Sequence, residues 1–182
     1  MARVPYVNYD ELDAAGREIY DRIRRDRNAK EVGFQFRAML HSPQAASHLT
    51  SMGAELRFKS AIPDDLKELA IIVVAREWSS DIEWTAHAAL AAKAGVSAEI
   101  IEAIRTGKSD VALSEPQRVV VTFVHQLMRE KTLSNENFAA AQKLLGTRGV
   151  VDLTLTCGYY TAINMTQQAL KPEMEAGKAS TL

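Results

Sequence analysis

The sequence predicts an all-α fold of about eight helices. Apolar residues recur with the 3.6-residue period of a helix in nearly every segment of the 182-residue chain. Capping residues, prolines and glycines stand at the boundaries between these segments. No two segments show the alternating apolar pattern and turn residues that would indicate a pair of β-strands.

Four helices are expected in the first half of the chain, at residues 10–25, 44–59, 66–78 and 81–94. Pro43 and Pro63 stand at the starts of the second and third, where proline is favoured. Residues 66–78 are apolar almost all round, which indicates a buried helix. Gly95 follows the fourth helix and is expected to end it.

Four more helices are expected at residues 97–107, 119–131, 134–146 and 148–170. Ser97 and Ser134 are expected N-caps, and the run from Ser114 to Gln117 has the S-x-x-Q form of a capping box. We therefore expect a single helical domain over residues 1–170, followed by a polar C-terminal tail at 171–182.

Composition excludes several classes of protein. The formal net charge is −1 and no basic block is present, so a nucleic-acid partner is not expected. The apolar run at 69–75 is too short to span a membrane, and residues 1–12 lack the apolar core of a signal peptide. One cysteine, Cys157, permits neither an intrachain disulfide nor a CxxC pair. We expect a cytoplasmic protein.

Glu83 and His87 are the first candidates for chemistry. Four helical residues turn about 400°, so their side chains lie about 40° apart on one face. One interpretation is a carboxylate that orients an imidazole for acid/base catalysis. The other is structural, because Ser80 and Glu83 also have the S-x-x-E form of a capping box.

Glu68 is the third candidate, because its helical neighbours at i+3 and i+4 are Ile71 and Ile72. A carboxylate on such an apolar face suits proton transfer, although a solvated glutamate near a helix start remains the alternative. His41 and His48 are seven residues apart and match no ligand spacing, so no metal site is expected.

The spacing Glu68-x11-Ser80-x2-Glu83-x3-His87 resembles the signature of the carboxymuconolactone decarboxylase family and its relative alkyl hydroperoxidase D. The runs LKELAIIVVAREW, IEWTAHAALAAKAGVS and GYYTAINM are similar to the cysteine-free branch of this family. The resemblance covers about residues 5–170. It implies an alkyl hydroperoxidase D-like helical fold and homo-oligomers, such as dimers, trimers or hexamers, with sites near subunit contacts.

The hydroperoxidase branch carries cysteines where this chain has Ser80 and Glu83. Peroxide reduction needs a thiolate and a resolving thiol, so the hydroperoxidase or peroxiredoxin-like alternative is weakened. Cys157 is expected to be a buried structural residue.

The resemblance favours a cofactor-free lyase that decarboxylates a small carboxylated lactone, such as 4-carboxymuconolactone, or a related carbonyl acid. Glu68, Glu83 and His87 are the expected catalytic residues, and no metal or organic cofactor is required. The expected substrate-binding residues are Arg76, Trp84 and Tyr159. An arginine should hold the substrate carboxylate, and Arg76 and Arg57 are both candidates for this role. The remaining alternative is a non-catalytic oligomer that binds a small ligand.

Overall fold

The computed structural model describes residues 1–108, 110–174 and 179–182, and it is all-α within these ranges. The helices are α1 (Ala14–Asp26), α2 (Phe34–Met39), α3 (Pro43–Phe58), α4 (Asp64–Glu77), α5 (Asp81–Lys93), α6 (Ala98–Thr106), α7 (Glu115–Glu130) and α8 (Asn135–Leu170), preceded by the 3-10 turn η1 (Tyr9–Glu11). The predicted fold class is confirmed. None of the described helices is both long and apolar enough to cross a lipid bilayer.

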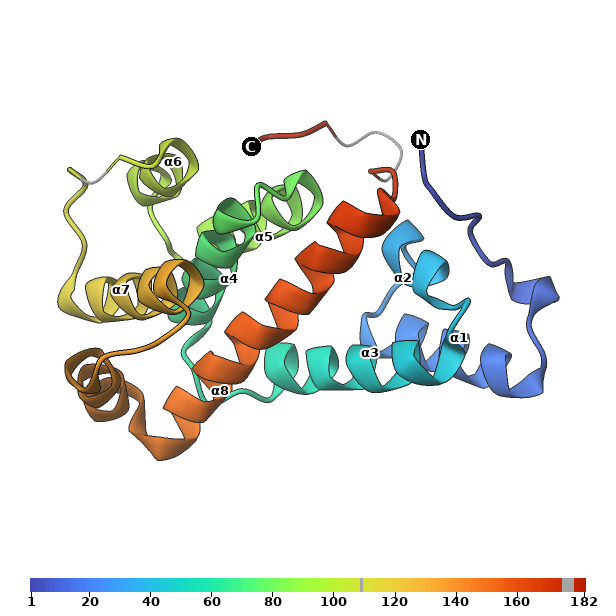
Figure 1. Cartoon of the computed structure of the whole chain (residues 1–182), viewed down its shortest axis with the longest axis horizontal. Helices are drawn as coiled ribbons and strands as arrows, with labels where there is room; N and C mark the ends of the chain where they lie inside the picture. Colours follow the sequence, from blue (N-terminus) through green and yellow to red (C-terminus); the bar gives the residue numbers. More distant parts are fainter. Residues whose placement is uncertain (109, 175–178) are drawn as a thin grey trace. The chain divides into compact units, whose positions relative to one another are not determined.

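The chain folds into two compact units. The first consists of Met1–Lys59 with Met165–Ala179, and the second of Ser60–Asn164 with Ser180–Leu182. In the first unit, α1 and α2 pack against α3. In the second, α4 packs against α5, α6 and α7 (Figure 1). The expectation of a single domain over residues 1–170 stays a prediction, and residues 175–178 of the expected tail lie outside the described residues.

Helix α4 is the centre of the second unit, and the prediction that it is buried is confirmed. Every residue from Leu66 to Ala75 is buried, including the charged Lys67 and Glu68. A helix apolar on all sides needs neighbours on all sides, and α5, α6 and α7 supply them. Glu68 is therefore held on a fixed backbone inside the core.

The predicted caps are confirmed at three helix starts. Ser97 accepts a hydrogen bond from the Ile100 N–H, and Ser134 accepts one from the Asn137 N–H. Ser114 and Gln117 form the two-way capping box. These bonds satisfy backbone donors that have no partner within the helix, which is why a local sequence pattern could identify them.

In the first unit, one predicted helix boundary is wrong and one helix is missed. The expected helix at 10–25 begins later, because Leu12 is extended and the Asp13 side chain caps α1 by accepting from the Gly16 N–H at 2.8 Å. Helix α2 was not predicted, because its six residues are too few to show a helical period.

Helix α8 carries a break at Gly146, whose φ of 71° and ψ of 175° are not helical. The break agrees with the prediction that one helix ends at Gly146 and the next runs to Leu170. The part of α8 that follows Gly146 belongs to the second unit up to Asn164. That part brings Tyr160 into the buried interior, where it is 2% exposed.

Candidate functional site

Glu68, Glu83 and His87 form one buried cluster in the second unit. The Nδ1 atom of His87 lies 2.7 Å from Oε2 of Glu68, and Nε2 lies 3.4 Å from Oε2 of Glu83. All three residues are buried, and His87 is only 4% exposed. Both ring nitrogens therefore face carboxylates in a part of the protein that excludes water.

The geometry of the cluster follows from its two helices. Glu83 and His87 are one turn apart on α5, so they share a face, as their spacing predicts. Glu68 comes from α4, which packs against α5. The Ser80 side chain makes no capping hydrogen bond, so the two-way capping box considered for Ser80 and Glu83 does not form.

Two opposing effects set the pKa of His87. Burial lowers it, because the imidazolium loses its hydration. Hydrogen bonds to Glu68 and Glu83, together with the negative charges of both, raise it and outweigh burial. The pKa of His87 therefore lies above the ordinary value of 6.5. An imidazole held in this way is suited to donate a proton.

Tyr160 is a fourth member of the cluster. Its hydroxyl lies 3.2 Å from Nε2 of His87, and the two rings meet edge to face. Tyr159, the tyrosine expected to bind substrate, packs edge-on against Tyr160 with ring centroids 5.0 Å apart. Adjacent helical residues differ in direction by about 100°, so the YY pair alone did not tell which ring points toward His87.

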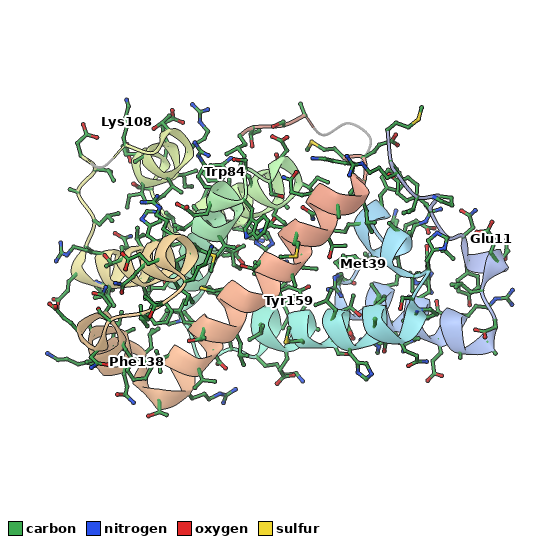
Figure 2. The ribbon with its side chains drawn as sticks, viewed as in Figure 1. Glu11, Met39, Trp84, Lys108, Phe138 and Tyr159 are labelled. Carbon is green, nitrogen blue, oxygen red and sulfur yellow. The ribbon has the colours of Figure 1, made fainter. Side chains whose placement is uncertain are left out.

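Trp84 and Arg76 do not join the hydrogen-bonded cluster. Trp84 follows Glu83 on α5 and is 1% exposed (Trp84 and Tyr159 are labelled in Figure 2). Arg76 lies eight residues after Glu68 on α4, a distance of about 12 Å along the helix. Its Nε donates to the Arg105 carbonyl at 2.8 Å, toward α6. The substrate-binding roles of Arg76, Trp84 and Tyr159 stay predictions.

Cys157 does not have the properties of a catalytic thiol. It is fully buried on α8, and burial raises its pKa to about 12. A thiol with this pKa is protonated near neutral pH, whereas the nucleophile in peroxide reduction is the thiolate. Within residues 1–108, 110–174 and 179–182, no group of three His, Cys, Asp or Glu side chains is arranged to hold a metal ion.

Most of the cluster lies within a stretch of the chain that a family model matches. The model of the carboxymuconolactone decarboxylase family matches residues 43–124, a range that contains Glu68, Glu83 and His87. Residues 43–124 are therefore similar to the domain of this family. The match covers α3 to α6 and part of α7, so Tyr160 reaches the cluster from outside the matched range. No curated protein sequence matches the chain.

Solved structures are similar to the chain well beyond this matched range. A cysteine-to-alanine variant of the debrominase Bmp8, in complex with 2,3,4-tribromopyrrole, matches with a TM-score of 0.75 and 11% identity, covering 97% of this chain and 95% of that one. The apo form of Bmp8 matches with a TM-score of 0.70 and 12% identity, covering 91% and 90%. At such low identity the match establishes a shared fold, and it confirms the expected alkyl hydroperoxidase D-like architecture.

Proposed function

We propose that the protein is a cofactor-free lyase that decarboxylates a small carboxylated lactone, such as 4-carboxymuconolactone or a related carbonyl acid. The observation that carries this proposal is the buried contact between His87 and Glu68, with Glu83 on the other side of the ring. It is supported by the match to the carboxymuconolactone decarboxylase family, which covers all three residues.

The reaction needs a proton source and a place for negative charge. The bond between the ring carbon and the carboxylate breaks, carbon dioxide leaves, and the electron pair passes through the conjugated ring to the lactone carbonyl. The resulting enolate then takes a proton on carbon. His87 supplies this proton, because the two carboxylates favour its protonated form.

Tyr160 provides the path for the proton. Its hydroxyl lies beside Nε2 of His87, while Nδ1 is held by Glu68. In the proposed step the Tyr160 O–H donates its proton to the substrate carbon, and the Nε2 proton of His87 replaces it. Glu68 orients the ring and Glu83 stabilises its charge. The catalytic group that touches substrate is then Tyr160, with His87 as the acid behind it.

A thiol-dependent function is not favoured. The two cysteine positions of the hydroperoxidase branch are Ser80 and Glu83, and the thiol of Cys157 has a pKa of about 12. The debrominase Bmp8 shares the fold at 11% identity, which carries no reaction over to this chain.

Turnover in deuterium oxide tests the proposal. The purified protein is incubated with 4-carboxymuconolactone and with related lactone acids, while carbon dioxide release and deuterium at the new C–H bond are measured. We expect His87→Gln to lower kcat by roughly 100-fold or more, the usual contribution of a general acid. The matched control is His125→Gln, because His125 lies 3.5 Å from Glu77 on α4 and outside the cluster.

Two results would contradict the proposal. One is the absence of carbon dioxide release from every lactone acid by a folded protein, which favours the non-catalytic alternative. The other is equal turnover by wild type and His87→Gln, which removes His87 from the reaction.

A further inference from the structure

One face of α8 carries three buried polar side chains. Thr156, Tyr160 and Asn164 are four residues apart, so they lie within about 80° of one another on the helix. Their exposed fractions are 1%, 2% and 0%. The middle one reaches His87, which places this face of α8 against the candidate site.

Asn164 differs from Tyr160 in having no hydrogen-bond partner. Neither its Nδ2 donor nor its Oδ1 acceptor is paired within the described part of the chain, and Thr156 Oγ1 is unpaired as well. Burying a donor or acceptor without a partner is costly, so native proteins seldom keep one. An amide with both groups unpaired, one turn from Tyr160, has the property expected of a residue that pairs with a ligand.

We propose that Asn164 is a substrate-binding residue that holds the carbonyl oxygen of the ligand through Nδ2. This inference rests on the proposed function, in which negative charge develops on that oxygen. A neutral N–H donor in a dry site binds a carbonyl and strengthens as charge grows on the oxygen. Oδ1 accepts from a donor of the same ligand or from a water bound with it.

This assignment concerns the substrate carbonyl, whereas an arginine was expected to hold the substrate carboxylate. Arg76, one candidate for that role, is bonded toward α6 and lies about 12 Å along α4 from Glu68. Asn164 is on the face of α8 that already contacts His87. The ligand chemistry that fits is therefore an uncharged carbonyl such as a lactone, with the reacting carbon within reach of Tyr160.

The test measures binding and needs no turnover. The probe is 2(5H)-furanone labelled with carbon-13 at its carbonyl, followed by NMR as protein is titrated. We expect the wild-type protein to bind it at millimolar concentration with a downfield shift of the carbonyl carbon. Asn164→Leu should weaken binding roughly tenfold or more and abolish the shift, because the donor is gone.

Stability distinguishes a ligand residue from a structural one. Asn164→Leu removes two unpaired buried polar atoms and keeps the number and branching of the side-chain heavy atoms, so its melting temperature should be unchanged or higher. Asn164→Ala removes the whole amide, including the Nδ2 donor, and it should also lose the carbonyl shift. Thr156→Val is the matched control, since it removes the other unpaired atom on this face, and it should bind the probe as the wild type does.

Four results would overturn the proposal. They are no binding of the furanone by the wild-type protein, binding by Asn164→Leu within about twofold of wild type, a retained carbonyl shift in Asn164→Ala, and equal loss of binding in Thr156→Val. If Asn164→Leu does not fold, Asn164→Ala still decides between the outcomes. Failure of the lactone acids to turn over would leave the furanone result standing, so the two proposals fail separately.

Discussion

His87 lies between two carboxylates, and its charge depends on both of them. Because its folded pKa is above 6.5, the folded protein binds this proton more tightly than the unfolded chain does. The resulting stabilisation is complete below the unfolded pKa and is lost as the pH rises through the folded pKa. The same proton is the one required by the proposed reaction.

The first prediction concerns this titration. We expect the imidazole of His87 to titrate above 6.5 in an NMR pH series, because Glu68 and Glu83 favour the imidazolium. The melting temperature of the wild type should fall more than that of His87→Gln as the pH rises through the measured pKa. A midpoint below 6.5 would mean that burial dominates and that His87 is a neutral base.

The second prediction compares the two carboxylates. Glu68→Gln should lower the pKa of His87 more than Glu83→Gln does, because the Glu68 contact is 2.7 Å and the Glu83 contact 3.4 Å. Both variants should lower kcat, while Glu83→Gln changes the free energy of unfolding by only about 1 kcal/mol. NMR titration, turnover and urea unfolding measure the three quantities. Unchanged turnover in Glu83→Gln would remove Glu83 from the proposed reaction.

The third prediction concerns Cys157. With its pKa raised to about 12, the buried thiol should not react with a disulfide reagent until the protein unfolds. An assay with an organic hydroperoxide and a dithiol reductant should show no enzyme-dependent consumption. Robust consumption that disappears in Cys157→Ser would make Cys157 a nucleophile and restore the hydroperoxidase alternative.

At the scale of single elements, α8 depends on one glycine. Gly146 has φ 71° and ψ 175°, a conformation that is essentially restricted to glycine. A Cβ added there meets nothing within 4 Å, so backbone conformation and not space limits the residue. The break interrupts the helix before the part of α8 that carries Tyr160.

The fourth prediction uses this glycine. Gly146→Ala should lower the free energy of unfolding by about 1–3 kcal/mol, the usual cost of such backbone strain. Gly158→Ala is the matched control, because Gly158 is helical on the same element and also has open space around a new Cβ. It should stabilise the protein by about 0.5–1 kcal/mol. Equal effects of the two variants in urea unfolding would contradict the role of the break.

The helices also differ in how well the local sequence pattern predicts where they form. The cap of α7 was predictable because Ser114 and Gln117 satisfy backbone donors within four residues, although the helix begins at Glu115 and not at the expected residue 119. Helix α2 was not, since a six-residue helix shows less than two turns of periodicity. Its existence depends on packing against α3, a contact that no local pattern specifies.

At the scale of the whole molecule, the fifth prediction is a homo-oligomer. Val151 and Leu155 are one turn apart on α8 and are 50% and 46% exposed. Exposed apolar side chains at this spacing form a surface that a second copy can cover. Light scattering should give a mass that is a multiple of 20.1 kDa, and Leu155→Lys should reduce it. A wild-type mass of a single chain at micromolar concentration would contradict the prediction.

The sequence by itself determined the features that depend on neighbours along the chain. It predicted the all-α class, the buried character of α4 and the shared face of Glu83 and His87. These follow from the helical period and from backbone groups that need caps, and both act over about four residues. The link between Glu68 and His87 was available before the structure only through the resemblance to a family.

The tertiary structure decided which side chains meet across helices. It placed Tyr160 and not Tyr159 against His87, directed Arg76 toward α6, and left both polar atoms of Asn164 unpaired. Such contacts depend on the angle and register at which helices pack, which are set by the whole set of interdigitating side chains. A helical period states which residues share a face, but only packing determines what that face touches.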